Sequence, residues 1–192
     1  MNNIINSIIK EHTTLISNIE KNHSSKIQTA VKWIVDALKS RNKILFAGNG
    51  GSAADAQHLS AEFIGRFRRE RPALPAIALT TDTSILTAVG NDYGFEEIFA
   101  RQIEGLIEEG DIFYAITTSG NSENIVKAVK VCHKTPSKTI GLLGKDGGKV
   151  GEMVDLPIII ESNDTARIQE VHSTIGHIIC ELVENSLYGD NV

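Results

Sequence analysis

The sequence predicts an α/β protein with a doubly wound, five-stranded parallel sheet flanked by helices. Short apolar runs alternate with longer amphipathic segments along most of the chain, and runs of this length fit buried strands better than helices. Two of the runs end in polar corners that contain glycine and lead directly into a helix. Alternating strands and helices are joined by right-handed crossovers, which make the strands parallel and cover both faces of the sheet.

Each predicted strand is bounded by turn-forming residues. The strands cover residues 44–47, 76–79, 112–116, 139–143 and 156–160. Helices are expected from Ser52, from about Thr83 to Val89, from about Phe95, after Ser122, and from Asp164 or Thr165 to about Leu187.

The N-terminal region, residues 1–41, is predicted as a pair of amphipathic helices. Apolar residues recur at three-to-four spacing on either side of His23-Ser24-Ser25, which is the expected break. We expect the apolar faces of this pair to pack partly on the sheet and partly on another subunit. Because no linker or internal repeat is present, residues 1–192 are expected to form a single domain with an α/β core in 42–188.

The composition is that of an ordinary globular protein, with 41% hydrophobic and 22% charged residues. A net charge of −5 gives no general electrostatic reason to bind nucleic acid or an anionic membrane, despite the basic run Arg66–Arg71. No apolar stretch approaches membrane-spanning length, and the N-terminus lacks the apolar segment of a signal peptide. Two cysteines, Cys132 and Cys180, fit a reducing compartment, so we expect a soluble cytoplasmic protein.

The stretch from Lys43 to Arg66 is typical of a strand, a glycine-rich corner and a helix. The corner is Gly48-Asn49-Gly50-Gly51, followed by Ser52 as a good N-cap residue and by Asp55, whose charge the helix dipole favours. Free N–H groups at such a helix start bind phosphate. The corner also matches a dinucleotide fingerprint loosely, but the acidic residue that this fingerprint needs comes late. A sugar-phosphate site is therefore favoured over a dinucleotide site or a plain tight turn.

A second corner, Thr117-Thr118-Ser119-Gly120-Asn121-Ser122, follows the third strand and repeats this pattern. Four hydroxyls and an asparagine gather around a glycine, whereas helix capping alone would need only one such residue. Ligands of parallel sheets bind beyond the carboxyl ends of the strands, where both corners lie. The second corner is therefore predicted to bind phosphate.

Two pairs of polar side chains have spacings that suit chemistry. His58 and Glu62 are four residues apart on one helical face, just after the first corner. A surface pair of this kind contributes only roughly 0.2–0.5 kcal/mol, but the neighbouring anion site favours metal ligation or proton transfer. Gln169 and His177 share a side of the last helix. Spacing alone does not decide which polar residues of that helix form a site.

Six motifs together resemble the phosphoheptose isomerases of the sugar isomerase (SIS) fold. They are GNGGSAADAQHLSAE, TTDTS, GNDYGFEEIFARQ, TSGNS, GKDGG and TARIQEVH, in this order over about residues 30–188. The resemblance implies a homotetramer of doubly wound subunits with active sites built between chains. It also implies an aldose–ketose isomerase that converts sedoheptulose 7-phosphate into D-glycero-D-manno-heptose 7-phosphate, for lipopolysaccharide or related heptose biosynthesis.

Carried over by motif, the resemblance assigns roles to individual residues. One zinc ion per subunit is implied, with the ligands His58, Glu62, Gln169 and His177. Substrate contacts are implied for Asn49, Gly50, Gly51, Ser52, Glu62, Arg66, Asn91, Asp92, Thr117, Thr118, Ser119, Ser122 and Gln169. Glu62 and His177 match the catalytic acid/base pair. His172 and Glu181 stay unassigned.

These residue types suit the implied reaction. Moving a carbonyl from C2 to C1 needs a base that removes a proton from C1 and returns one at C2 through an enediol or enediolate, and Glu62 could be that base. Zinc would polarise the carbonyl and hydroxyl oxygens. His177 could move oxygen-bound protons or assist ring opening, and the division of roles between the two residues stays open.

A second interpretation comes from the same fold. The segments RPALPAIALTTD and LVENSLYG also resemble the DnaA initiator-associating protein, a tetramer that binds the replication initiator and is not known as an isomerase. The pattern of that relative lacks the equivalents of Glu62 and His177, and both are present here. The enzyme is therefore the favoured interpretation, with initiator binding as the alternative.

Overall fold

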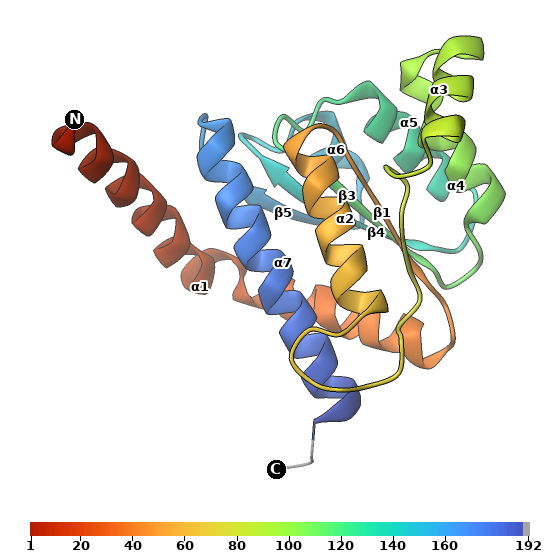
Figure 1. The fold of residues 1–192 in the computed structure, drawn as a ribbon, viewed down its shortest axis with the longest axis horizontal. Helices are drawn as coiled ribbons and strands as arrows, with labels where there is room; N and C mark the ends of the chain where they lie inside the picture. Colours follow the sequence, from red (N-terminus) through yellow and green to blue (C-terminus); the bar gives the residue numbers. More distant parts are fainter. Residues whose placement is uncertain (190–192) are drawn as a thin grey trace.

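The computed structural model describes residues 1–189, and the predicted fold class is confirmed (Figure 1). Five parallel strands form one sheet in the order β2-β1-β3-β4-β5. Their bounds are β1 Ile44–Gly48, β2 Ala76–Ala78, β3 Ile112–Thr117, β4 Lys138–Gly144 and β5 Leu156–Ile160. The chain therefore adds strands first to one side of β1 and then to the other side of it, which makes the sheet doubly wound.

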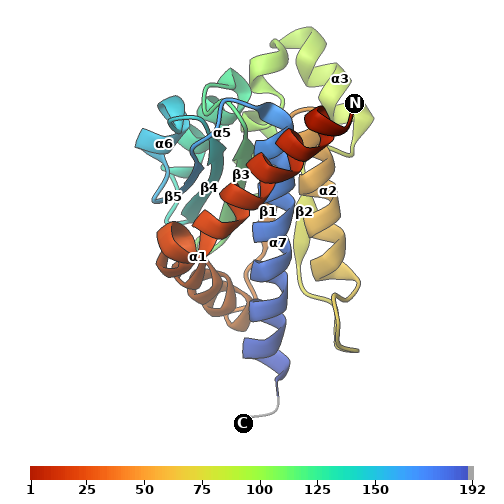
Figure 2. The ribbon, with the colours of Figure 1, turned by 90° about the vertical axis from the view of Figure 1, so that its left-hand side faces the viewer.

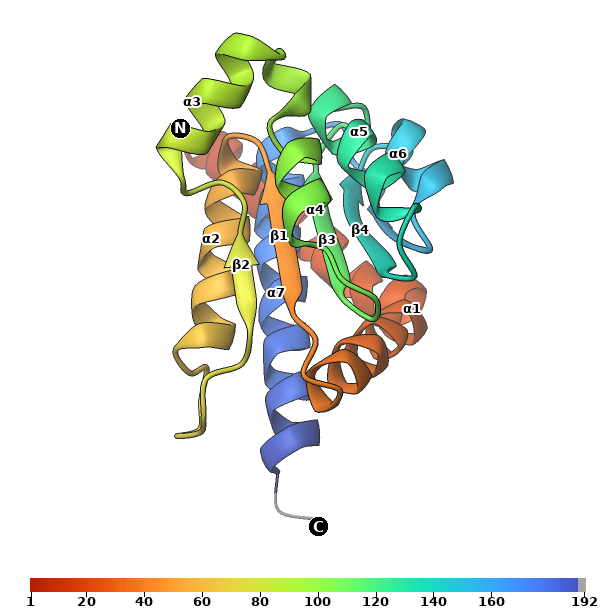
Figure 3. The ribbon, with the colours of Figure 1, turned by 90° about the vertical axis from the view of Figure 1, so that its right-hand side faces the viewer.

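Helices cover both faces of the sheet (Figure 3). Their bounds are α1 Asn2–Lys39, α2 Gly51–Ile64, α3 Thr83–Asp92, the 3₁₀ helix η1 Phe95–Glu97, α4 Ala100–Leu106, α5 Glu123–Cys132, α6 Gly148–Met153 and α7 Thr165–Tyr188. Helices α1, α2 and α7 pack on one face, whereas α4, α5 and α6 pack on the other. Successive residues of β1 alternate between the two cores, because strand side chains point to opposite faces in turn.

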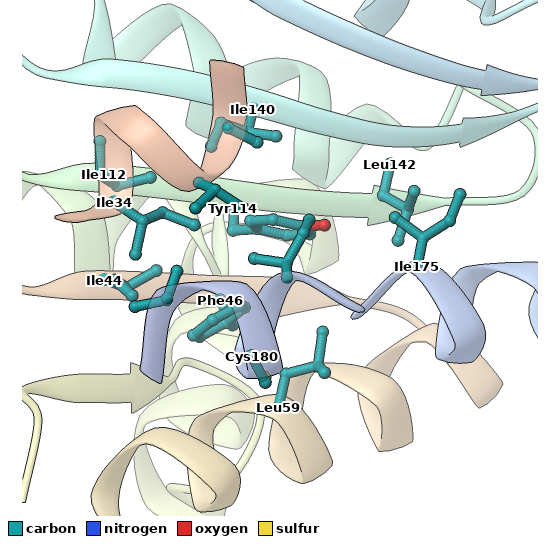
Figure 4. Packing of buried hydrophobic residues seen from close by; sticks show 14 of the residues in the cluster. Ile34, Ile44, Phe46, Leu59, Ile112, Tyr114, Ile140, Leu142, Ile175 and Cys180 are labelled. Carbon is teal, nitrogen blue, oxygen red and sulfur yellow. The ribbon is translucent and has the colours of Figure 1, made fainter. Parts of the chain in front are cut away.

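Aromatic rings fill the centre of the core beneath α2 and α7 (Figure 4). The ring centroid of Phe46 lies 5.3 Å from that of Tyr114 and 6.0 Å from that of Phe63. Leu59 of α2 and Ile175 of α7 close over this group from the helix side. Burying each such side chain contributes about 1.5–3 kcal/mol, so this layer attaches both helices firmly to the sheet.

The expected pair of N-terminal helices is wrong, because α1 is one helix from Asn2 to Lys39. The hydroxyl of Ser24 donates to the carbonyl of Glu20 at 2.7 Å, and that of Thr29 donates to Ser25 at 2.9 Å. The hydroxyls thus bond within the helix instead of ending it. Such bonds often bend a helix, and the axis of α1 changes direction part-way along (Figures 1 and 2).

Several predicted boundaries also need correction. Helix α2 begins at Gly51 with Gly50 as its N-cap, so Ser52 lies inside the first turn and is not the cap. Gly50 has a φ of 56°, which favours glycine, and it places the N-cap two residues earlier than expected. The helix expected from Phe95 is a short 3₁₀ turn followed by α4, and α6 was not predicted. No helix within residues 1–189 is long and apolar enough to cross a membrane.

Candidate active site

The two predicted phosphate corners are brought together at the centre of the sheet. The corner at 48–51 ends β1 and the corner at 117–122 ends β3, and these strands are neighbours. The chain leaves β1 towards one edge of the sheet and β3 towards the other, so the corners flank the topological switch point, where such sheets bind ligands. The side-chain amides of Asn49 in the first corner and Asn124 in α5, just after the second corner, make two reciprocal hydrogen bonds of 2.9 Å.

The first corner presents the start of α2 to a ligand. Gly50 is the N-cap and offers no side chain to the first turn. The N–H groups of Ser52 and Ala53 donate to the carbonyls of Asn49 and Gly50 at 3.0 Å, and the dipole of the helix start still suits an anion. A Cβ atom at Gly51 would clash with the side-chain amide of Gln169. A larger residue at position 51 would thus displace the end of the Gln169 side chain, and the packing of α7 places Gln169 at the first corner.

The second corner gathers hydroxyls at the start of α5. The Oγ1 atom of Thr117 lies 3.1 Å from the Oγ atom of Ser122 and 3.4 Å from that of Ser119. Ser122 is the N-cap of α5, but its side chain makes no capping hydrogen bond. The hydroxyls and the helix N-terminus thus face the same small region. Hydroxyl and N–H donors in this arrangement suit a phosphate group.

Side chains from α2 and α7 form a cluster of three possible metal ligands. The nitrogen and oxygen atoms that His58, Glu62 and His177 offer lie within 4.8 Å of one another. The Nε2 atom of His58 is 3.2 Å from Oε1 of Glu62 and 3.4 Å from Nε2 of His177. The packing of α2 on α7 brings these residues together, although spacing in the sequence could only pair His58 with Glu62.

The donor set of this cluster fits zinc. Nitrogen and oxygen ligands at about 2.0–2.1 Å in a tetrahedral arrangement lie about 3.3 Å from one another. The separations of 3.2 Å and 3.4 Å from the Nε2 atom of His58 match that edge length, whereas Glu62 and His177 are further apart, within 4.8 Å. Two imidazoles and a carboxylate are also common zinc ligands. The His58 side chain is 48% exposed and that of Glu62 is 22% exposed, so a substrate can reach the cluster.

Neighbouring groups hold the cluster from two sides. The ring of Phe67 stacks on that of His177 with centroids 5.5 Å apart and planes inclined by 29°. Asp55, one turn before His58 in α2, accepts a 2.7 Å hydrogen bond from the hydroxyl of Ser173 in α7. Burial raises the pKa of Asp55, while the Ser173 hydroxyl and the nearby histidines oppose this effect. Sequence reasoning missed Phe67, Ser173 and the amide partner Asn124, because no local pattern distinguishes them.

Four predicted site residues lie away from the cluster in the single chain. Gln169 precedes His177 by eight residues, a rise of about 12 Å along α7, and its amide contacts the first corner instead. Arg66 is 59% exposed and pairs with Glu70 at 3.7 Å. Asn91 and Asp92 are exposed on α3, where the amide of Asn91 donates to Asp92 at 2.8 Å.

The two unassigned residues of the last helix have structural partners. The Nε2 atom of His172 lies 3.1 Å from the carbonyl oxygen of Leu143 in β4, and the ring is fully buried. Burial lowers the pKa of His172 to about 4, so the ring is neutral and Nε2–H donates this bond at pH 7. Glu181 pairs with Arg68 at 3.2 Å, next to the loop that carries Phe67.

A hollow of about 680 Å³ lies beside the second corner. It is lined by Asn121, Lys145, Asp146, Ile159, Glu161, Ser162 and Asn163. Asn121 belongs to the second corner, and the other lining residues are neither predicted ligands nor predicted substrate contacts. The predicted zinc ligands lie instead on α2 and α7.

Comparisons with known proteins show the family to which the chain belongs. The family model for the SIS domain matches residues 9–144. The phosphoheptose isomerase of Geotalea daltonii is 55% identical over 186 residues, which cover 97% of each chain. The chain belongs to the phosphoheptose isomerase family of SIS-domain proteins. Another member, from Nitratiruptor sp., is 52% identical and covers 92% of this chain and 94% of its own.

Solved structures of the phosphoheptose isomerase family have the same fold as this chain. The phosphoheptose isomerase GmhA of Neisseria gonorrhoeae matches with a TM-score of 0.91 and 40% identity, over 96% of this chain and 98% of its own. The phosphoheptose isomerase of Francisella tularensis matches with a TM-score of 0.92 and 40% identity, over 95% of this chain and 97% of its own. Membership of this family makes the protein an isomerase that acts on a phosphorylated sugar.

Proposed function

We propose that the protein converts sedoheptulose 7-phosphate into D-glycero-D-manno-heptose 7-phosphate. The observation that carries this proposal is the convergence of His58, Glu62 and His177 on one accessible point between α2 and α7. Two phosphate-binding corners at the switch point of the same sheet supply the recognition that a sugar phosphate needs. The names of the relatives support a seven-carbon sugar phosphate as the substrate.

The reaction needs a proton carrier at the carbon atoms and another at the oxygen atoms. Glu62 takes the proton from C1 and returns it at C2, because a carboxylate held beside the reacting carbons is a suitable general base. His177 moves the oxygen-bound protons, and the stacked Phe67 ring keeps its imidazole in place. The hydroxyls of Thr117, Ser119 and Ser122 hold the phosphate, so the open-chain sugar is oriented before proton transfer begins.

We propose zinc as the cofactor, one ion per subunit. His58, Glu62 and His177 would hold it, since the Nε2 atom of His58 lies at the separation from the other two donors that tetrahedral zinc requires, and all three donors lie within 4.8 Å of one another. Zinc bound there would polarise the oxygens at C1 and C2. Glu62 then has two tasks, as ligand and as base, and its second carboxylate oxygen allows both.

A homotetramer with sites shared between chains would explain where Gln169 acts. Within one chain this residue lies about two turns of α7 away from the three clustered side chains, so it reaches an ion only from a second copy. Arg66, Asn91 and Asp92 are exposed and free to meet substrate in the same way. Exposed Ile4, Ile5, Ile8 and Ile9 on α1 provide an apolar face for assembly.

The proposed setting is heptose biosynthesis for lipopolysaccharide or a related glycan, in the cytoplasm. The product is a phosphorylated heptose, which such pathways build into cell-surface sugars. Cys132 and Cys180 are both unpaired and buried, as a reducing compartment would allow.

Turnover of sedoheptulose 7-phosphate by metal-stripped protein, with and without added zinc, tests the function. Zinc-restored aldose formation is expected. Activity that is indifferent to metal would keep the isomerase and remove zinc from the proposal. Absence of conversion by the folded tetramer would contradict the proposed reaction and favour the alternative, binding of the replication initiator DnaA, which pull-down from lysate would then examine.

A further inference from the structure

A buried carboxylate lies two helical turns beyond His177 on α7. Glu184 is 2% exposed and accepts four hydrogen bonds from one short loop. Its Oε1 atom accepts the backbone N–H groups of Arg68 at 2.9 Å and Arg69 at 2.7 Å. Its Oε2 atom accepts the N–H of Phe67 at 3.1 Å and Nε–H of Arg71 at 3.0 Å. The carboxylate therefore organises the whole loop that follows α2.

The partner of Glu184 caps the end of α2. The Arg71 side chain, also 2% exposed, donates from Nη2 to the carbonyl of Glu62 at 2.7 Å and from Nη1 to that of Phe63 at 2.9 Å. Carbonyls in the last turn of a helix have no partner within the helix. Arg71 satisfies two of them in the turn that carries the Glu62 side chain.

The same loop delivers an aromatic ring to the other side of the cluster. Phe67 stacks on His177, and its own backbone N–H is one of the donors to Glu184. The two ends of the buried ion pair thus act on two different members of the cluster. One end holds the backbone of Glu62, and the other holds the ring that supports His177.

We propose that Glu184 is a positioning residue that fixes Glu62 and His177 relative to each other, by clamping the 65–71 loop through Arg71 and Phe67. This inference rests on the proposed function, because that function gives Glu62 and His177 their catalytic roles. The contacts of Glu184 do not depend on it. Burial raises the pKa of Glu184, but the four donors together outweigh this effect and lower it, so the carboxylate stays charged at neutral pH. Loss of the clamp frees the last turn of α2 and the Phe67 ring together.

The test compares Glu184→Gln with Asp111→Asn. Asp111 is a matched control, because it is a fully buried carboxylate that accepts the backbone N–H groups of Lys43 and Glu108 and pairs with the Lys43 ammonium at 2.8 Å. It lies before β3, at the end of the sheet opposite the two corners. Both variants are expected to lower the melting temperature, since in each the N–H donors that bonded a buried carboxylate face a neutral side-chain amide instead.

Two further readouts separate positioning from stability. Zinc affinity is measured by competition with a chromophoric chelator, and the proton shifts of the His177 ring are measured in zinc-free protein. Glu184→Gln is expected to weaken zinc binding by about tenfold or more, as changes behind metal ligands do, and to move the His177 resonances towards those of Phe67→Leu. Asp111→Asn is expected to leave both readouts unchanged.

Unchanged zinc affinity and His177 shifts in folded Glu184→Gln would overturn the inference and leave the residue a purely structural one. If Glu184→Gln does not fold, Arg71→Lys takes its place, because a lysine ammonium cannot bond Glu184 and both α2 carbonyls at once. Arg71→Lys is expected to weaken zinc binding and to shift the His177 resonances in the same direction. If the wild-type protein binds no zinc and has no turnover, the proposed function fails, whereas the His177 shifts still decide whether the clamp positions the ring.

Discussion

The imidazole rings of His58 and His177 meet edge to face, with their Nε2 atoms 3.4 Å apart, although the residues are 119 positions apart in the chain. At this distance one ring nitrogen can donate its N–H to the other. A metal ion bound between the two nitrogens would take the place of that proton, and Glu62 supplies a negative charge beside it. The pair is therefore the feature that most favours a metal at this site.

His58→Ala should weaken zinc binding by more than the roughly 100-fold loss typical of changing a residue that only supports a ligand. The reason is that the substitution removes one of three donors. Chelator competition on the purified protein measures the affinity. His133→Ala, at the exposed end of α5, is the control and should bind zinc as the wild type does. Equal affinities in the two variants would contradict a metal site at His58.

Glu62→Gln should lower kcat by about 10²- to 10⁴-fold, the usual contribution of a general base. The amide has the same shape but cannot take the C1 proton. Turnover is measured at saturating zinc, and the molecular mass in solution should be unchanged. Glu70→Gln, at an exposed carboxylate nearby, should keep the wild-type rate. A rate near that of the wild type in Glu62→Gln would mean that another residue is the base.

The double substitution Ser119→Ala with Ser122→Ala should raise KM for the sugar phosphate about 10- to 100-fold, with a smaller effect on kcat. It removes two hydrogen bonds of about 0.5–1.5 kcal/mol each from a group that does not react. The inhibition constant of inorganic phosphate should rise in parallel. Ser186→Ala, whose hydroxyl bonds only within α7, should change neither constant. A KM equal to that of the wild type would place the phosphate elsewhere.

Acid should destabilise the folded protein through the protonation of His172. Its pKa is about 4 in the folded protein, against 6.5 when exposed, so the unfolded chain binds more protons between these values. Stability from this residue is therefore complete above about pH 6.5 and is lost as pH falls towards 4, to a total of about 3 kcal/mol. Urea unfolding of zinc-free His172→Gln should show a weaker pH dependence than the wild type. If the free energy of unfolding has the same pH dependence in the variant and the wild type, His172 is not the source of the loss of stability in acid.

Ile5→Glu with Ile9→Glu should lower the molecular mass in solution below that of a tetramer. Both side chains are more than half exposed in the single chain, at 52% and 56%, and burying a charge in an apolar interface is costly. Analytical ultracentrifugation measures the mass. Asn2→Glu with Asn6→Glu adds the same charge with the same spacing and should leave the assembly intact. An unchanged mass in the isoleucine variant would exclude this face from the interface.

Most of the fold could be predicted from local patterns. Each strand is a continuous apolar run between turn residues, and the burial of β1 and β3 on both sides explains why these runs do not alternate with polar residues. The break at His23-Ser24-Ser25 could not be judged in this way, since the hydroxyls bond back into the helix only in the folded state. The start of α2 was missed because a glycine, not the better capping serine, occupies the N-cap.

The sequence by itself determined the parallel sheet, its two polar corners and the pairing of His58 with Glu62, because these depend on periodicity and on residues close together in the chain. No local pattern placed His177 with that pair; the family resemblance implied it, and the packing of α7 on α2 brings the three side chains together. Only the tertiary structure decided that Gln169 contacts Gly51 and that Glu184 organises the 65–71 loop. Those contacts depend on how α7 packs against α2. Helix packing is set by side chains far apart in sequence, so no local pattern contains it.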